Sequence, residues 1–279
     1  MTLDIDTTSA GSADRALKER HRKMWASGDY PAVVSEVISE LGPVVTEAAG
    51  IGSGDRVLDV AAGDGNVAIP AARRGARVTA SDLTPELLSV GARKAEEAGV
   101  DVEWQVDDAE ALRYADDTFD VVTSCVGVMF APHHQRAADE LVRVTRPGGR
   151  IAVLSWTPEG FIGQMFATMK PYAPAPPPGA QPPPLWGRPD HVEQLLGAKV
   201  TDLRTERRVV RVARFAGGEE FRDFFKRTYG PTIVTYRAIA EDPQKVEALD
   251  AELAALGERH LHDGVMEWEY LLVTARKAG

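Results

Sequence analysis

Residues 56–66 read Arg-Val-Leu-Asp-Val-Ala-Ala-Gly-Asp-Gly-Asn, an apolar run that meets a Gly-X-Gly turn. A helical pattern follows, so the stretch predicts a strand, a tight loop and the N-terminus of a helix. Glycine at 63 and 65 lets the backbone approach a ligand closely. The carboxylate of Asp59 inside the apolar run is unusual. A loop built only for a pyrophosphate has no use for it, whereas a ligand with an ammonium or sulfonium group does.

Strand and helix patterns alternate from residue 56 onward, and this alternation predicts a parallel, doubly wound α/β sheet. Ligands bind beyond the carboxyl ends of the strands in such sheets. Asp59, Asp82 and Asp108 lie at or just beyond three of these ends, so we expect them to gather around one ligand. The five strands are expected at 56–61, 77–81, 102–106, 119–126 and 150–156.

The flanking segments predict helices and two further strands. Helices are expected at 13–24 and 31–49, and residues 171–189 hold so many prolines that an extended, stiff segment is expected there. About fifty residues with two amphipathic helices separate the strands expected at 207–215 and 268–275, and an insertion of this length favours a lid. The predicted division is an N-terminal helical segment (1–50), a core (51–157), and the remaining strands (158–279) with the proline-rich segment (171–189) and a helical lid (217–262).

Composition narrows the classes of partner. The 279-residue chain has a formal net charge of −10, which argues against nucleic acid because phosphate binding needs a basic face. The apolar runs are too short for a membrane span, and the first residues do not form a secretory signal, so a cytoplasmic protein is expected. Cys125 is the only cysteine, and no His, Asp or Glu cluster has convincing metal spacing, so no metal is expected. A small-molecule partner fits best.

Taken together, residues 56–156 resemble the class I S-adenosylmethionine-dependent methyltransferases, in particular the small-molecule branch that includes quinone-biosynthesis methyltransferases. The resemblance implies a Rossmann-like, mostly parallel seven-stranded sheet. One departure is Ala61, where the family loop often has glycine. The motifs that carry the resemblance are Val-Leu-Asp-Val-Ala-Ala-Gly-Asp-Gly at 57–65, Ser-Asp-Leu-Thr-Pro at 81–85, Asp-Asp-Ala-Glu-Ala-Leu at 107–112, Phe-Asp-Val-Val at 119–122 and Arg-Pro-Gly-Gly at 146–149.

The resemblance assigns roles in binding S-adenosyl-L-methionine, which becomes S-adenosyl-L-homocysteine. Asp59 would accept from the methionine ammonium, Asp82 from both ribose hydroxyls and Asp108 from the adenine amino group. Trp25 and Tyr30 could close over the cofactor, because an aromatic face favours a sulfonium. The cofactor-binding residues predicted in this way are Asp59, Ala61, Gly63, Gly65, Asp82, Leu83, Asp108, Ala109, Ser124, Tyr30 and Trp25.

The expected reaction transfers a methyl group to an O, C or N atom of an apolar or aromatic small molecule. Placement and exclusion of water supply most of what the protein must contribute. A general base is needed only if the acceptor must lose a proton, and His133 and His134 are the candidates. No Asn-Pro-Pro-Tyr-like tetrapeptide follows the fourth strand, which favours O- or C-methylation. The predicted substrate residues are Met129, Phe130, Trp156, Phe225 and Tyr229.

Three alternatives stay open at this point. Gly63-X-Gly65-X-X-Ala68 with Asp82 also fits a dinucleotide fingerprint, so a nicotinamide-dependent oxidoreductase is the second candidate, although Asp108 would have no role there. A non-catalytic protein that keeps the cofactor site is the third. The aspartates could also simply cap helices or pair with arginines. The apolar lid helices could support a homodimer.

Overall fold

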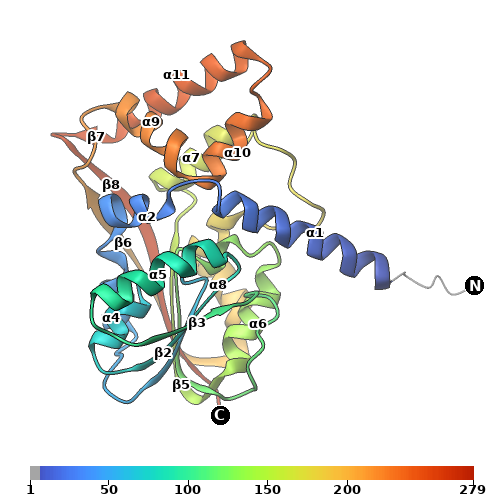
Figure 1. Ribbon diagram of the computed structural model, residues 1–279, viewed down its shortest axis with the longest axis vertical. Coiled ribbons are helices and arrows are strands. Elements are labelled where there is room, and N and C mark those ends of the chain that lie inside the picture. The colour runs from blue at the N-terminus through green and yellow to red at the C-terminus, as the bar shows by residue number, and fades with distance from the viewer. Residues whose placement is uncertain (1–6) are drawn as a thin grey trace, which may run out of the picture.

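The structure, a computed structural model, describes residues 7–279, with side chains described from Asp14 onward. A twisted eight-stranded sheet forms the centre, with helices packed around it (Figure 1). Its strand order is β3-β2-β1-β4-β5-β8-β6, and the short β7 pairs with β8. The doubly wound α/β class expected from the sequence is confirmed.

The first five strands are parallel, whereas β8 runs antiparallel to both of its neighbours, β5 and β6. The central strands are almost entirely buried because helices cover both faces of the sheet. The strands are β1 (Arg56–Val60), β2 (Arg77–Asp82), β3 (Val102–Val106), β4 (Phe119–Cys125), β5 (Thr145–Trp156), β6 (Val200–Val212), β7 (Leu261–His262) and β8 (Val265–Lys277).

Helices follow the strands where turn and capping residues place them. Pro85 begins the helix after β2, a position where its missing N–H costs nothing. Helix α6 packs against β4 and β5, and α8 packs against α6. The helices around the sheet are α3 (Leu41–Ala48), α4 (Ala68–Arg73), α5 (Pro85–Glu97), η2 (Val128–Phe130), α6 (His134–Val144), η3 (Pro183–Gly187), α8 (Pro189–Leu196) and η4 (Gly197–Lys199).

The N-terminal region differs from the expected helices at 13–24 and 31–49. Helix α1 (Thr7–Trp25) starts earlier, and the second helix is divided into α2 (Tyr30–Val33), a π-helix η1 (Val34–Ile38) and α3. Pro43 has no N–H to donate within a continuous helix, so it sits in the first turn of α3 instead. At Gly42 a Cβ would lie 1.8 Å from the Asn66 carbonyl oxygen, so α3 packs directly on the loop after β1.

The prediction of an extended, stiff segment at 171–189 is wrong in part, because this segment contains the 3-10 helix η3. Trp186 is fully buried there, and a Cβ at Gly187 would lie 2.1 Å from the Trp156 carbonyl oxygen. Close packing on the end of β5 therefore overrides the extended tendency of the prolines.

Helices α9 (Gly218–Thr228), α10 (Gly230–Ala238) and α11 (Pro243–His260) are inserted between β6 and the β7–β8 hairpin. Figure 1 shows them with α7 (Phe161–Met169) at one end of the sheet, on the side of α1 and α2. Helix α10 packs against α1, and α9 packs against α2. The N-terminal helices and the insertion therefore meet.

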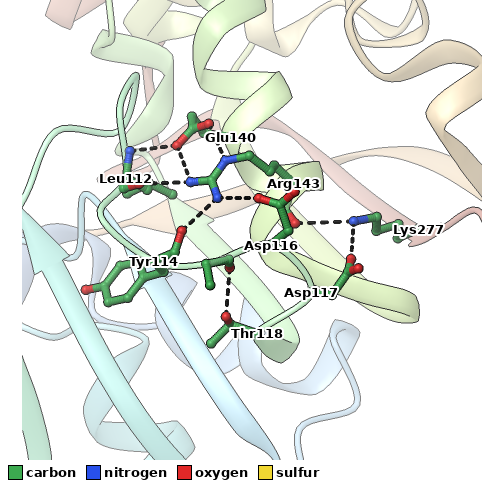
Figure 2. Close-up of polar contacts among 9 residues, drawn as sticks. Leu112, Tyr114, Asp116, Asp117, Thr118, Glu140, Arg143 and Lys277 are labelled. Carbon is green, nitrogen blue, oxygen red and sulfur yellow. Dashed lines mark hydrogen bonds and ion pairs between the residues drawn. The ribbon is translucent and has the colours of Figure 1, made fainter.

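Arg143 on α6 fixes the connection between β3 and β4 (Figure 2). Its guanidinium donates to the carbonyl oxygens of Leu112 and Tyr114 at 2.8 and 2.7 Å, and to the carboxylates of Asp116 and Glu140 at 2.8 and 2.7 Å. Glu140 also accepts from the Leu112 N–H at 2.7 Å. These contacts stabilise the loop that begins directly after Asp107 and Asp108.

Candidate functional site

A pocket with about 840 Å³ of empty space, part of it open to solvent, lies at the carboxyl ends of the parallel strands. Helix α1, the α2–η1 segment, and the segments after β1, β2, β3 and β4 all contribute to its wall. The lining residues are Lys18, His21, Trp25, Tyr30, Val34, Ile38, Ala61, Ala62, Gly63, Asp64, Asn66, Asp82, Leu83, Leu87, Asp107, Asp108, Ala109, Cys125, Val126, Gly127, Phe130, Ala131 and Pro132.

The loop after β1 turns sharply through left-handed backbone conformations. Gly63 and Gly65 have φ values of 58° and 89°, which glycine adopts without strain. Ala61 has φ of 53°, so alanine holds a conformation at the position where the family often has glycine. A Cβ at Gly63 would lie 3.7 Å from the Tyr30 ring. The loop thus brings bare backbone and one aromatic ring together at the pocket.

Asp82 lies at the end of β2 and lines the pocket. Its Oδ2 accepts from the Gly63 N–H at 2.9 Å, and its Oδ1 accepts from the Thr84 N–H at 2.8 Å. Burial raises the pKa of its carboxyl group, although these two N–H groups favour the charged form. A carboxylate has about four lone-pair sites, so Asp82 can accept two further hydrogen bonds from a ligand.

Asp108 lies just after β3 and is tied to the N-terminal helix. The Lys18 ammonium lies 3.0 Å from Asp108 Oδ1 and 2.8 Å from Glu110 Oε2. Burial alone would raise the pKa of Glu110, but Lys18 and the His133 N–H hold this pKa below its usual range. Asp14, Glu110 and His133 have ligand atoms within 4.8 Å of one another, and Lys18 already places a positive charge against that group.

Asp59 is placed behind the pocket rather than on its wall, because it is 1% exposed and is not among the lining residues. Its Oδ1 accepts from the Thr123 hydroxyl at 3.0 Å, and the Ala68 N–H also favours its charged form. Burial nevertheless raises its pKa to about 7. Oδ2 has no hydrogen-bond partner among residues 14–279. Asp59 therefore links β1, β4 and the start of α4.

An aromatic cluster covers the other side of the pocket. Trp25 packs edge-on against Tyr30, Phe130 and Tyr229, with ring centroids 5.3, 4.8 and 5.8 Å apart. Phe166 lies beside both Phe130 and Tyr229. Trp25, Tyr30 and Phe130 line the pocket, whereas Tyr229 lies behind them. The predicted aromatic residues of the N-terminal segment and of the insertion therefore come together.

Several predicted site residues lie in the core instead of on the pocket wall. Met129, Trp156 and Phe225 are almost fully buried. Trp156 packs on Trp268 and on Tyr270, because β8 pairs with β5. The sequence pattern could not show this long-range pairing.

Gly65 and Ser124 support the pocket from outside its wall. A Cβ at Gly65 would lie 2.7 Å from the Trp104 ring. The Ser124 hydroxyl donates to the Val60 carbonyl oxygen at 2.7 Å and accepts from the Val128 N–H at 2.8 Å, so it fixes the turn after β4.

The two histidines expected as bases have different surroundings. His133 is half-buried, and its Nδ1 lies 3.0 Å from Glu110 Oε2. His134 is fully buried, and its Nδ1 lies 3.0 Å from Nε2 of His191 on α8. Burial and the neighbouring His191 lower the pKa of His134 to about 4. Neither lines the pocket, but His133 follows Pro132, which does.

Sequence analysis missed Lys18, His21, Asp64 and Asn66 as pocket residues. Lys18 and His21 are three residues apart on α1, so they share a helix face. That spacing was a usable signal, but their placement depends on how α1 docks. Asp64 lies between the two glycines of the loop, and its side chain has a buried oxygen without a partner among residues 14–279.

The parallel sheet, its glycine-containing loop and the pocket beyond the strand ends define a Rossmann-like α/β protein. The family model described as a methyltransferase domain matches residues 57–149. An uncharacterized protein of Mycobacterium tuberculosis is 53% identical over 92% of this chain and 94% of its own. Demethylmenaquinone methyltransferase of Thermus thermophilus is 40% identical over 40% of this chain and 52% of its own. The YcgJ protein from Bacillus subtilis has a TM-score of 0.59 at 18% identity, over 86% of this chain and 99% of its own.

Residues 57–149 therefore belong to the methyltransferase domain family, and the fold is that of the class I, Rossmann-like S-adenosylmethionine-dependent methyltransferases. The comparisons give no support to the nicotinamide alternative. Within residues 7–279, none of the helices combines the length and apolar character that a bilayer crossing requires.

Proposed function

We propose that this protein transfers a methyl group from S-adenosylmethionine to an O, C or N atom of an apolar or aromatic small molecule. The observation that carries the proposal is a single pocket lined by Asp82, Asp108 and the rings of Trp25, Tyr30 and Phe130. Residues 51–157 would form the cofactor-binding core, and α9–α11 would cover the substrate. Two carboxylates for a nucleoside and an aromatic wall for the acceptor then adjoin one another.

The pocket residues fit this cofactor. Asp82 would hold the ribose hydroxyls with its remaining lone pairs, and Leu83 would lie against the adenine. Asp108 would accept from the adenine amino group. The left-handed turn at Gly63 leaves its N–H on Asp82 and leaves no side chain in the way. The bound cofactor supplies an electrophilic methyl group on a good leaving group, and the protein orients the acceptor and excludes water.

His133 is the better of the two candidate bases. Its Nδ1–H can donate to Glu110, which leaves Nε2 able to accept a proton from the acceptor. His134 is buried against His191 and Trp186, away from the pocket wall. We therefore assign the base role to His133 for acceptors that must lose a proton, such as phenols.

Binding and turnover test the proposal in that order. Isothermal calorimetry should show binding of S-adenosylhomocysteine, and Asp82→Ala should abolish it. Transfer of a radiolabelled methyl group to a panel of quinols, phenols and aromatic amines should then identify the acceptor class. Absence of cofactor binding by the wild type would refute the proposal, and binding without turnover on any acceptor would favour a non-catalytic role.

His133→Ala should lower turnover of a proton-losing acceptor by about 10²–10⁴-fold and leave cofactor affinity unchanged. His133→Gln is the matched variant, because it keeps the contact to Glu110 without a basic nitrogen. A loss below threefold in both variants would remove His133 from the mechanism.

A further inference from the structure

Trp104 is a half-buried aromatic residue on β3 that does not line the pocket. Its indole ring nevertheless contacts the loop after β1. A Cβ at Gly65 of that loop would lie 2.7 Å from Cη2 of Trp104, and a Cβ at Gly91 of α5 would lie 2.4 Å from the same atom. Both distances are too short for a real Cβ. The outer edge of the indole therefore fills the space between the loop and α5.

Helix α5 approaches the same loop at two further points. A Cβ at Gly91 would also lie 3.1 Å from the backbone carbonyl carbon of Asp64, so the bare glycine allows the helix to come close. Lys94 lies three residues later on the same helix face, and its ammonium pairs with the Asp64 carboxylate. Neither Gly91 nor Lys94 lines the pocket. The loop is thus held by residues that lie outside the pocket wall.

The loop in turn holds Asp82, which lines the pocket. The Gly63 N–H donates to Asp82 Oδ2 at 2.9 Å, and the Gly65 N–H donates to the Ala62 carbonyl oxygen at 3.0 Å. Both glycines have positive φ values, so the turn depends on a backbone conformation that other residues rarely adopt. Because only Asp64 separates the two glycines, a displacement at Gly65 changes the position of the Gly63 N–H and hence the support of Asp82.

We propose that Trp104 is a positioning residue of the binding site. Its indole, seated between Gly65 and Gly91, fixes the loop in the conformation in which the Gly63 N–H orients the Asp82 carboxylate. Glycine inside a helix lowers helix stability relative to alanine, and the space that the indole occupies accounts for the glycine at position 91. The consequence for ligand affinity rests on the proposed function, whereas the effect on the loop does not.

Amide hydrogen exchange in the ligand-free, full-length protein tests the loop directly. Gly91→Ala places a methyl group against the indole, and it should speed exchange at the Gly63 and Gly65 amides by at least about tenfold. Exchange at the Leu58 amide, in the buried strand β1, should change by less than about threefold. Ser89→Ala, at an exposed position of the same helix, is the matched control and should leave all three amides unchanged.

Trp104→Phe provides a second test, because a phenylalanine ring lacks the outer edge of the indole that the new methyl group would meet. Gly91→Ala alone should weaken binding of S-adenosylhomocysteine in calorimetry by about 10–100-fold. The double variant Gly91→Ala/Trp104→Phe should bind at least about threefold more tightly than Gly91→Ala alone. A general loss of stability would not be repaired by a second substitution that removes further packing.

Three results would overturn the inference. Unchanged exchange at Gly63 and Gly65 in Gly91→Ala would mean that the indole moves aside without the loop. Equally faster exchange at Leu58 would show a general destabilisation, and additive affinity losses in the double variant would show that Trp104 and Gly91 act separately. A cooperative thermal transition confirms that each variant is folded. If the wild type does not bind S-adenosylhomocysteine, the proposed function fails, whereas hydrogen exchange still decides whether Trp104 fixes the loop.

Discussion

Single residues of the loop after β1 carry strain and buried charge that the rest of the fold must offset. Ala61 holds a left-handed φ of 53°, and Val126, directly after β4, holds a φ of 51°. Both residues line the pocket. Unfavourable backbone conformations of non-glycine residues persist where surrounding packing fixes them, and they concentrate at functional sites. The strained positions here face the ligand space from two neighbouring strands.

Ala61→Gly should raise the free energy of unfolding by about 1 kcal/mol, because glycine adopts the left-handed conformation without the steric cost of a Cβ. Ala62→Gly is the matched control, since Ala62 has no positive φ. It should lower the free energy of unfolding by about 0.5–1 kcal/mol through the added freedom of the unfolded chain. Urea unfolding of both variants checks the opposite signs, and a loss of stability in Ala61→Gly would contradict the argument.

The carboxyl group of Asp59 should make stability depend on pH. Burial raises the pKa of this carboxyl group to about 7 in the native state, whereas its ordinary value is 3.8. Between these values the native state keeps a proton that the unfolded chain has released, so stability falls as pH rises toward 7 and is flat above it. The slope is at most about 1.4 kcal/mol per pH unit. Asp59→Asn should remove this component, as urea unfolding at pH 4.5, 6 and 8 would show; an unchanged pH profile would contradict the raised pKa.

At the scale of elements, ion pairs and hydrogen bonds fix segments that have little regular structure. The connection between β3 and β4 is held by Arg143, and α1 is held by Lys18 against Asp108 and Glu110. Helix α6 meets α8 through His134 and His191. These contacts join elements that are distant in sequence, and each contact fixes a segment next to the pocket or its supports.

Arg143→Met should lower the free energy of unfolding by about 2–3 kcal/mol, because two backbone carbonyl groups and Glu140 lose a charged donor. Arg136→Met on the same helix is the matched control. Arg136 is exposed, so its replacement should change stability by less than about 0.5 kcal/mol. Equal effects of the two substitutions in urea unfolding would show that Arg143 contributes no more than an exposed arginine.

The His134–His191 contact should destabilise the protein in acid. Burial and the neighbouring His191 lower the pKa of His134 to about 4 in the native state. Between about pH 4 and pH 6.5 the unfolded chain therefore binds a proton at this histidine that the native state does not bind. Stability should therefore fall as pH decreases from 6.5 toward 4, opposite in direction to the effect of Asp59. His134→Gln should flatten this part of the profile in thermal unfolding, whereas His262→Gln, at an exposed position, should leave it unchanged.

At the scale of the whole molecule, the pocket is completed by parts from both halves of the chain. Helix α1 supplies Lys18, His21 and Trp25, and the inserted helices pack behind them through Tyr229. The parallel core alone would leave one side of the pocket uncovered. Cofactor binding is therefore expected to depend on the docking of α1.

Deleting residues 1–25 should weaken binding of S-adenosylhomocysteine by at least about tenfold, because it removes three lining residues and one aromatic face. Deleting residues 1–13 is the matched control and should change the affinity by less than threefold, since Lys18, His21 and Trp25 remain. Calorimetry gives the affinities, and a cooperative thermal transition confirms that each variant is folded. Unchanged affinity after deletion of residues 1–25 would show that α1 does not contribute to the binding site.

The sequence predicted what depends on local pattern and strand order. The five parallel strands, Asp82 and Asp108 follow from apolar runs and from the rule that parallel strand ends meet at one edge. The close packing of Gly42, in α3, on Asn66 depends on a contact between distant segments, which no local pattern contains. The burial of Trp156 depends on pairing with a strand more than a hundred residues later. The position of Lys18 at the pocket depends on its ion pair with Asp108, which lies ninety residues later in the chain.

The position of β8 has a consequence for biosynthesis. Strand β6 emerges from the ribosome some fifty residues before β8, yet β8 lies between β5 and β6 and is the only hydrogen-bonded neighbour of β6 within residues 7–279. The nascent chain must therefore hold an unpaired edge at β5 and an orphan strand at β6 until Val265–Lys277 has been translated. Arginines at 204, 207, 208 and 211 place positive charge along β6, and this charge discourages pairing with a neighbouring nascent chain during that delay.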